Sequence, residues 1–300
     1  MTYLVTGATG SIGRRVVREL AGRGVALRAL TRDPGRARGL PGGVEVVAGD
    51  LGEPEGLAGA LAGVERMVLF PYPDTAAEVV ALAKAAGVRR IVVLSSAAVT
   101  SGYDTMFHLP VERAVEASGL EWTFVRPGEF AGNKLELWGP SVRGERVVRD
   151  LDPDAPGSPV HPQDVADAIA TALVEDGHAG RAYTFNGAGR LSVRQQVAIL
   201  SRLLGEEVRP LAVTPQELRE HYLAQGGFAA AAADFLVGDV DYDGNGTEGG
   251  EPVETDWDEV LVPETAEIVT GRPARTFEEW AREHLEAFRT GAPTPSDGTG

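Results

Sequence analysis

The first 126 residues alternate short apolar runs with stretches of helical periodicity, and this restricts the fold more than any other feature of the chain. Runs that are apolar throughout are buried on both faces, as in parallel sheets covered by helices on either side. Ligands bind to such sheets beyond the carboxyl ends of the strands. We therefore expect an α/β fold with a doubly wound parallel sheet. Its expected strands are 3–6, 26–31, 44–47, 66–70, 90–95 and 122–126, and its expected helices are 12–22, 54–61, 74–86 and 110–118.

Beyond residue 127 the alternation ends, and the expected elements are mainly helical. Thr214 opens a capping box, with Glu217 at the third helical position and a proline at the first, so a helix should begin there. This helix should end at the glycine pair 226–227, and a second helix over 228–236 would complete a hairpin. The hairpin either packs as an ordinary helix pair or covers a ligand as a lid. Irregular stretches are expected at 127–144 and 149–162, a strand at 182–186, and further helices at 162–175, 192–204 and 276–289.

Charge and composition exclude several classes of protein. The 44 acidic and 28 basic residues give a net charge of −16, which disfavours nucleic-acid binding because phosphate contacts need a basic surface. The chain has no cysteine, and therefore no disulfide or thiolate metal site. The acidic stretch that begins at Asp239 has Gly250 where a calcium loop needs glutamate, so no metal is expected. Without an apolar run of about 18 residues, and with a strand close to Met1, we expect a cytoplasmic protein without membrane span or signal peptide.

A glycine-rich turn joins the first expected strand to the first expected helix, with the sequence Thr-Gly-Ala-Thr-Gly-Ser-Ile-Gly at 6–13. Its glycines permit a tight turn and let the backbone approach a pyrophosphate. The following helix N-terminus offers unpaired N–H groups and the positive end of its dipole. A tight turn without a ligand is the alternative, but the position at the start of a βαβ series favours a Rossmann-type dinucleotide site. The turn residues expected at the cofactor are Gly7, Thr9, Gly10, Ser11, Ile12 and Gly13.

The end of the second strand indicates which dinucleotide is bound. NAD sites usually place a carboxylate there for the ribose 2′-hydroxyl, whereas this chain has Thr31 and Arg32. A hydroxyl and a guanidinium suit a 2′-phosphate, so NADPH is expected, and the adjacent Asp33 leaves NAD as the alternative. Asp50 after the third strand is expected near the adenine, or else as a helix N-cap. The other residues expected at the cofactor are Leu51, Phe70, Pro71 and Pro127.

These motifs together resemble a known family. The glycine turn, Leu-Thr-Arg-Asp-Pro at 30–34 and Gly-Asp-Leu at 49–51 resemble the NmrA-like group of atypical short-chain dehydrogenases/reductases. Further matching segments lie at 118–128, 160–167 and 271–281, so the resemblance spans most of the chain. It implies a quinone or azo-dye reductase, a ketoreductase of secondary metabolism, or a protein that only senses the NADP state. The arginine-rich, lysine-poor composition also resembles actinomycete antibiotic-pathway reductases, among them the angucyclinone (simocyclinone-type) ketoreductases.

The chain lacks the acid that the wider superfamily uses. Typical members have a tyrosine that donates the proton and, four residues later, a lysine that lowers its pKa. Neither Lys84 nor Lys134 has a tyrosine four residues before it. Alignment with the family puts Asp104 at the tyrosine position and His108 at the lysine position.

Three residues remain as catalytic candidates. Ser95 and Ser96 follow the fifth strand, where a hydroxyl could bond a substrate carbonyl or else satisfy the backbone. His108 could hold the cofactor ribose or donate a proton near neutral pH, or else be a buried histidine at a helix start. A substrate with its own phenol beside the ketone would polarise its carbonyl internally, which would explain the missing tyrosine.

We therefore expect NADPH-dependent reduction of a ketone on an aromatic polyketide-type metabolite. The alternatives are a quinone reductase, which needs no tyrosine, and a non-catalytic NADP(H)-sensing regulator. The dinucleotide-binding domain is expected at 1–127, with later segments able to return to it, and a substrate-binding region at 128–290 with the lid at 214–236. Residues 291–300 are expected to form a disordered tail. The residues expected to contact an aromatic substrate are Tyr72, Phe107, Phe130, Asn133, Trp138, Tyr222 and Phe228.

Overall fold

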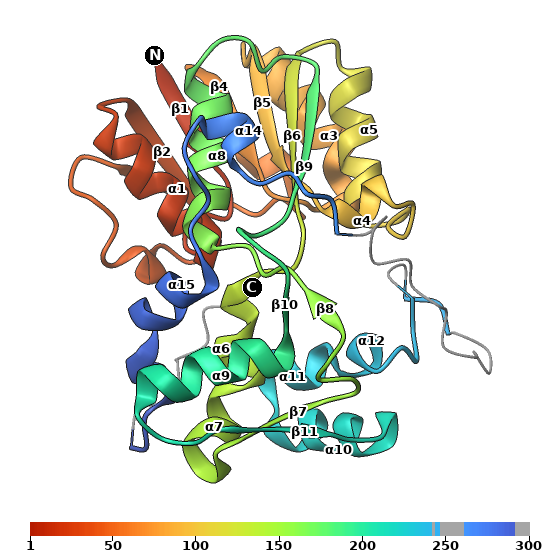
Figure 1. Cartoon of the computed structure of the whole chain (residues 1–300). Coiled ribbons are helices and arrows are strands. Elements are labelled where there is room, and N and C mark those ends of the chain that lie inside the picture. Colours follow the sequence, from red (N-terminus) through yellow and green to blue (C-terminus); the bar gives the residue numbers. More distant parts are fainter. Residues whose placement is uncertain (242–243, 247–260, 292–300) are drawn as a thin grey trace.

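The computed structural model describes residues 1–241, 244–246 and 261–291 as two parts, one above the other in Figure 1. The upper part contains strands β1 (Thr2–Val5), β2 (Ala26–Thr31), β3 (Glu45–Ala48), β4 (Val64–Leu69), β5 (Arg90–Leu94), β6 (Glu121–Pro127) and β9 (Arg181–Phe185). They form a seven-stranded parallel sheet in the order β3-β2-β1-β4-β5-β6-β9. From β1 the sheet is extended by β2 and β3 on one side and by β4, β5 and β6 on the other. The strand order therefore reverses between β1 and β4, and such a topological switch point is where these sheets bind ligands.

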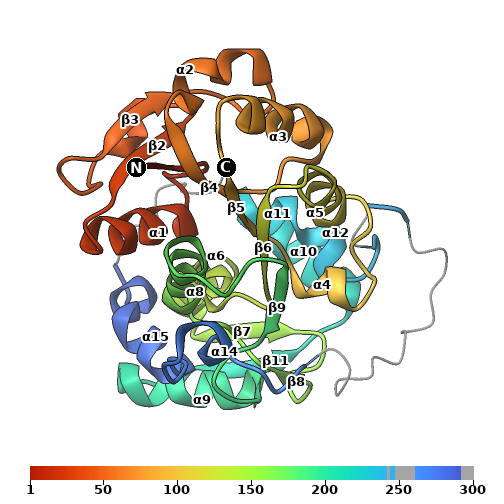
Figure 2. The same cartoon turned by 90° about the horizontal axis from the view of Figure 1, so that it is seen from above.

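Helices cover both faces of this sheet, as Figure 2 shows from above. They are α1 (Ser11–Gly22) and α8 (Pro162–Val174) on one face, and α2 (Ala58–Leu61), α3 (Ala76–Ala85) and α5 (His108–Ala117) on the other. Along β1, Tyr3 and Val5 join the core against α1 and α8, whereas Leu4 joins the opposite core. Successive side chains of a strand point to opposite faces, so the apolar residues of a strand such as β1 supply both cores at once. The expected doubly wound α/β fold is therefore confirmed.

The lower part is built from short elements around its own core, in which Trp280 and Phe288 are fully buried. Its helices are α6 (Lys134–Leu137), α7 (Gly139–Glu145), α9 (Val193–Leu204), α10 (Pro215–Gln225), α11 (Gly227–Ala231), α12 (Ala233–Leu236) and α15 (Phe277–Glu283). Its strands are β7 (Val147–Asp150), β8 (Pro156–Gly157), β10 (Leu191–Ser192) and β11 (Arg209–Ala212). β7 pairs with β11 in parallel, and β8 pairs with β10 antiparallel.

The chain passes between the two parts several times. After β6 it enters the lower part, returns to the sheet with α8 and β9, and then leaves again for β10 to α12. The short helix α14 (Glu267–Thr270) packs against α8 before the chain reaches α15. Residues 162–185 therefore lie in the layers of the upper part, beyond the expected boundary at 127. The connections between the two parts lie at one end of the sheet, so residues of both parts line the space between them.

Several expected elements were wrong in detail. The stretch 127–144, expected to be irregular, contains the 3₁₀ turn η4 (Ala131–Asn133), α6 and α7, which at seven residues or fewer are too short for periodicity to reveal. The stretch 149–162 includes β8 and the end of β7. The helix expected over 228–236 divides at Ala232 into α11 and α12. The last expected helix ends at Glu283 and continues as the 3₁₀ turn η5 (Leu285–Phe288).

The described residues include no helix with the length and apolar character needed to cross a membrane. They also include no cluster of three or more potential metal-binding side chains. Residues 292–300, which belong to the expected tail, and Gly250 lie outside the described residues.

Candidate nucleotide and substrate site

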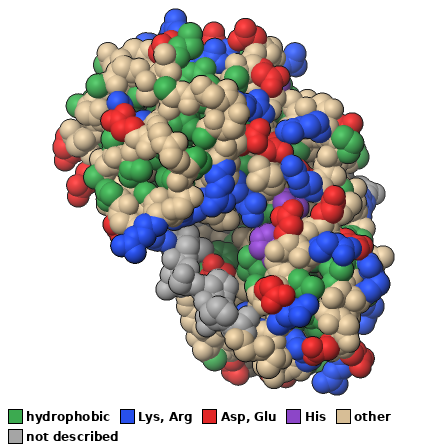
Figure 3. All heavy atoms as spheres, turned by 90° about the vertical axis from the view of Figure 1, so that its left-hand side faces the viewer, with side chains coloured by type: hydrophobic (Ala, Val, Ile, Leu, Met, Phe, Trp, Pro, Cys, Tyr) green, Lys and Arg blue, Asp and Glu red, His purple; other side chains and the backbone are tan. Residues whose placement is uncertain are grey.

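A pocket of about 850 Å³ lies between the two parts, and Figure 3 shows the molecule from the side where its surface is hollowed between them. Its volume is typical of small-molecule sites. The glycine turn and the ends of β2 and β4 form one side, and residues of α6, α11 and α15 form the other. The lining residues that the sequence analysis had selected are Gly7, Thr9, Gly10, Ser11, Ile12, Arg32, Asp50, Leu51, Phe70, Pro71, Tyr72, Phe107, Phe130, Asn133 and Phe228.

Two glycines of the turn, Gly7 and Gly13, are packed so closely that a side chain would have no room. Gly7 has a φ of +54°, and Gly10 donates its N–H to the Gly7 carbonyl at 3.0 Å. A Cβ atom on Gly13 would lie 2.0 Å from the Gly7 carbonyl oxygen, so Gly13 brings α1 directly against the turn and does not itself line the pocket. Gly10 is the N-cap of α1 and supplies no capping side chain, which leaves first-turn N–H groups for a ligand. This cradle fits a dinucleotide pyrophosphate.

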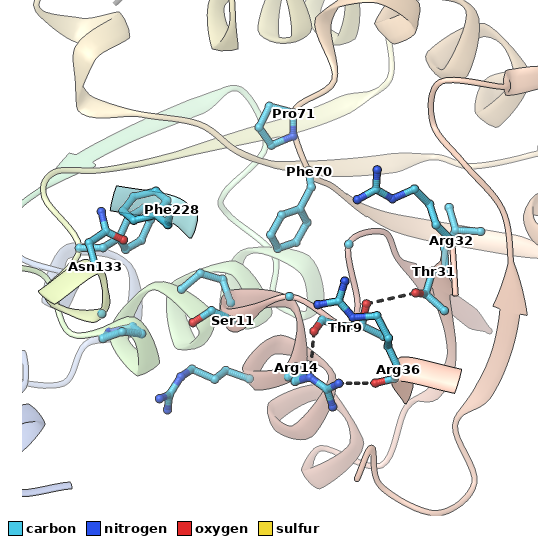
Figure 4. Close-up of a pocket in the computed structure, with 18 of the residues that line it drawn as sticks. Thr9, Ser11, Arg14, Thr31, Arg32, Arg36, Phe70, Pro71, Asn133 and Phe228 are labelled. Carbon is cyan, nitrogen blue, oxygen red and sulfur yellow. Dashed lines mark hydrogen bonds between the residues drawn. The ribbon is translucent and has the colours of Figure 1, made fainter. Parts of the chain in front are cut away.

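Hydrogen bonds join the loop after β2 to the glycine turn, as Figure 4 shows. The hydroxyls of Thr9 and Thr31 are 3.1 Å apart, and Arg14 donates to the carbonyl of Thr9 at 2.9 Å and to that of Arg36. The Asp33 carboxylate accepts the N–H of Gly35 at 2.8 Å, as the N-cap of the 3₁₀ turn η1 (Pro34–Ala37). Thr31, Arg32 and Asp33 all line the pocket, and both Thr31 and Asp33 also bond to the backbone of this loop.

The end of β4 lies across the same turn. Phe70 donates its N–H to the Thr6 hydroxyl at 2.8 Å, and a Cβ atom on Gly7 would lie 3.0 Å from the Phe70 ring. The phenyl ring therefore covers the turn. Asp50 lines the pocket and accepts the N–H of Gly52 at 2.9 Å. The alternative role of Asp50 as a helix N-cap is wrong, because Glu53 is the N-cap of the 3₁₀ turn η2 (Pro54–Leu57) that follows.

Two aromatic residues expected at the substrate are core residues instead. Trp138 is 4% exposed and packs in the core of the lower part, with the Lys134 ammonium 4.8 Å from its ring centroid. Tyr222 is 5% exposed and packs between α10 and the helices that follow, and its burial raises the pKa of the phenol. Neither lines the pocket. A fully buried aromatic side chain stabilises the fold more than a partly exposed one. The sequence alone did not show which face of each helix turns inward. Pro127, the buried end of β6, also lies outside the lining.

The three catalytic candidates lie outside the pocket lining, although Phe107 beside His108 is part of it. Ser95 is 2% exposed, and its hydroxyl has no hydrogen-bond partner among the described residues. Ser96 accepts the N–H of Ala98 at 3.2 Å and so caps the short helix α4 (Ala97–Thr100), which is the backbone role considered for it.

His108 is held by a buried carboxylate. Asp104 is completely buried and accepts the backbone N–H groups of Phe107 and His108 at 3.0 Å, and it pairs with Nδ1 of the His108 ring. Burial lowers the pKa of His108, and Asp104 and Glu112 offset only part of this effect. A neutral ring that donates its Nδ1 hydrogen to Asp104 carries none on Nε2, which weighs against His108 as a proton donor.

Several pocket residues were missed by the sequence analysis, among them Arg14, Arg15, Arg36, Trp280 and His284. Arg14 directly follows the glycine turn, a position that could have identified it as a neighbour of the turn. No sequence pattern identifies Trp280 and His284 as pocket residues, because they are far along the chain from the glycine turn.

The comparisons with known proteins agree with this geometry. A family described as NAD(P)H-binding matches residues 7–176, which is more than half of the chain. The chain belongs to this NAD(P)H-binding family. The expectation of a nicotinamide dinucleotide as cofactor is confirmed, and the matched segment begins at Gly7, the first glycine of the turn.

Similar proteins are reductases and regulators with the same fold. The (4-alkanoyl-5-oxo-2,5-dihydrofuran-3-yl)methyl phosphate reductase of Streptomyces griseus is 39% identical over 292 residues, which cover 95% of this chain and 98% of that protein. The NADPH-dependent quinone oxidoreductase of Escherichia coli, solved with NADPH, has a TM-score of 0.73 at 26% identity, covering 94% and 99%. The negative transcriptional regulator NmrA, solved with NADP, has a TM-score of 0.67 at 20% identity, covering 95% of each chain, and shares the fold.

The protein is therefore an NAD(P)H-dependent oxidoreductase with an NmrA-like fold. The resemblance found in the sequence is confirmed at this level. The narrower similarity to angucyclinone ketoreductases stays a prediction.

Proposed function

We propose that this protein is an NADPH-dependent reductase of electron-poor, conjugated carbonyl compounds. This class contains quinones, unsaturated lactones, and the aromatic ketones with a neighbouring phenol that the sequence led us to expect. The observation that carries the proposal is that one pocket joins the dinucleotide turn to the aromatic rings of Phe70, Phe130 and Phe228, in a chain without the tyrosine–lysine pair.

Preference for NADPH over NADH is supported by the loop after β2. Thr31, Arg32 and Arg36 line the pocket with a hydroxyl and two guanidinium groups, which suit a 2′-phosphate. The nearby Asp33 also lines the pocket, but one of its carboxylate oxygens caps η1, so three cationic or hydroxyl groups face the ribose position against one partly engaged carboxylate. When bound, NADPH supplies the hydride.

A conjugated acceptor removes the need for a strong acid in the protein. The negative charge that forms during reduction spreads over the substrate's own carbonyl groups, and the proton can then come from water. The chain's contribution is to orient the acceptor between aromatic walls and to exclude water from the reacting carbon. The names of two similar proteins support this class, since one acts on an alkanoyl-substituted unsaturated lactone and the other on quinones.

The test is NADPH oxidation, followed by absorbance, against a graded set of acceptors. We expect turnover of 1,2-naphthoquinone and of a polycyclic aromatic ketone with a neighbouring phenol, and weaker turnover of the same ketone with the phenol methylated. Cyclohexanone, which is not conjugated, should not be reduced, and NADH should be the poorer donor. Tight NADPH binding without turnover of any conjugated acceptor would contradict the proposal and support an NADP(H)-sensing regulator. Equal turnover of cyclohexanone would contradict the conjugated class.

The absence of an essential acid can be tested with Ser95→Ala, Ser96→Ala and His108→Gln, where the glutamine amide can still donate to the buried Asp104. General acid catalysis is worth about 100- to 10,000-fold, so each variant should lose less than about tenfold in kcat with 1,2-naphthoquinone. Melting temperatures check that each variant is folded. A loss of about a thousandfold in a folded variant would identify that side chain as a required proton donor or carbonyl ligand.

A further inference from the structure

The pocket contains a second cationic group, separate from the arginines after β2. Arg15 of α1, Trp280 of α15 and His284 line it together. Nη1 of Arg15 is 3.5 Å from Oε1 of Gln163 on α8, and its Nη2 is 3.5 Å from Nε2 of His284. This Arg15 group therefore lies where α1, α8 and α15 meet, whereas Arg32 stands at the end of β2.

Arg15 is a partly buried cation without a carboxylate partner. No carboxylate of the described residues lies within 4.0 Å of its guanidinium, whereas the neighbouring Arg275 is paired with two aspartates of α8. Burial lowers the pKa of Arg15, and the positive charges of Arg18 and Arg275 lower it further, while Glu283 opposes them. Buried charges in proteins are normally paired, so this guanidinium is suited to receive an anion from outside the chain.

The residues around Arg15 hold its position, and one of them is a buried donor. His284 donates from Nδ1 to the Trp280 carbonyl at 2.8 Å, which turns its Nε2 toward Arg15, and its ring stacks on Trp280 at 5.2 Å between centroids. Trp280 is 1% exposed, and its indole N–H has no acceptor among the described residues. A buried donor without an acceptor is uncommon in native proteins and is a second indication that a ligand belongs here.

We propose that the Arg15 group binds an anionic substituent of the substrate, either a phosphate monoester or a carboxylate. The proposal rests on the reductase function above, since the substituent would belong to the acceptor reduced in this pocket. The dinucleotide pyrophosphate has the same chemistry, but the glycine turn and the uncapped N-terminus of α1 already provide for it. The partners of Arg15 come instead from α8 and from the residue that follows α15, and Asn133 and Phe130 of the expected substrate wall line the same pocket. In Figure 3, arginine or lysine and histidine side chains border the hollow between the two parts, although the whole chain carries a net charge of −16.

The experiment compares Arg15→Met with Arg15→Lys, which retains the charge, and with Arg18→Met as the matched control. Arg18 is exposed, lies three residues further along α1, and does not line the pocket. The probes are 1,2-naphthoquinone and its 4-sulfonate, which differ by one anionic group. Arg15→Met should raise KM for the sulfonate by about 10- to 100-fold, the usual worth of a charged hydrogen bond. Arg15→Met should leave kcat, KM for the neutral quinone and Kd for NADPH within about threefold of the wild type. Arg15→Lys should have an intermediate KM for the sulfonate, and Arg18→Met should match the wild type in all of these constants.

Direct binding separates this proposal from the proposed function. Phenyl phosphate is titrated calorimetrically into wild type and Arg15→Met, each saturated with NADP⁺, so no turnover is needed. Binding by the wild type and its loss in the variant would support the anion site even if no quinone were reduced. Equal binding by the two proteins, no binding by the wild type, or equal KM changes for both quinones would overturn it. A parallel rise in Kd for NADPH would also overturn it and assign Arg15 to the pyrophosphate.

Discussion

Replacing Gly13 with alanine is expected to raise the Kd for NADPH by about 100-fold, because hydrogen bonds to a charged group such as the pyrophosphate are worth about 1.5–3 kcal/mol each. The added methyl group would lie 2.0 Å from the Gly7 carbonyl oxygen and 2.8 Å from its carbon, whereas real Cβ contacts under 3.0 Å essentially do not occur. Both atoms belong to backbone, so relief requires that α1 and the turn move apart. That movement would separate the helix N-terminus from the pyrophosphate position.

The measurement is fluorescence titration of NADPH, with circular dichroism to show that the variant remains folded. Gly22→Ala is the matched control, because Gly22 ends the same helix and a Cβ atom there would have nothing within 4 Å. We expect Gly22→Ala to bind NADPH like the wild type and to be no less stable, since alanine is the better helix former. Wild-type affinity in a folded Gly13→Ala protein would show that the turn is not the pyrophosphate site.

The upper part could be predicted from sequence because its evidence is local. From β1 to β6 most strands contain an apolar run, the connections stay within the upper part, and the turn at 6–13 has its glycines, strand and helix within a dozen residues. The same holds for Thr31 and Arg32, whose position at a strand end decides which part of a dinucleotide they can meet. These features required no knowledge of how distant segments pack.

The remaining site residues depend on packing between distant segments. Arg15 and His284 are 269 positions apart, and they meet only because the end of α15 comes near α1, which packs against α8. Trp138 and Tyr222 illustrate the opposite error, since their aromatic character predicted a ligand wall but their helices turn them into cores. An aromatic residue is apolar enough for either role, so only its neighbours in three dimensions distinguish a pocket wall from a core.

The attachment of α15 to the upper part is expected to depend on Arg275. Asp164 and Asp167 of α8 have side chains only 5% and 4% exposed. Arg275 donates its backbone N–H to Asp164 at 2.8 Å, and its guanidinium bonds Asp167 at 2.9 Å and also Asp164. Burial raises the pKa of Asp164 even with this partner present. Arg275→Met would leave two buried carboxylates with Arg272, 3.3 Å from Asp167, as the remaining cation.

We therefore expect Arg275→Met to lower the free energy of unfolding by about 3 kcal/mol, at the lower end for a broken buried ion pair because Arg272 still compensates in part. For a chain of this size the melting temperature should fall by roughly 6–12 °C in calorimetry. Arg202→Met, which removes an exposed pair with Glu278 of α15, is the control and should leave the melting temperature nearly unchanged.

A second substitution distinguishes loss of the ion pair from simple loss of packing. Adding Asp164→Asn to Arg275→Met should restore part of the stability, because a buried amide does not carry the unpaired charge. Since α15 carries Trp280 and leads to His284, Arg275→Met should also weaken phenyl phosphate binding while the glycine turn still binds NADPH. An unchanged melting temperature, or no recovery in the double variant, would show that the two aspartates do not need Arg275. In that case α15 would have to be positioned by the packing of the preceding helix α14 against α8.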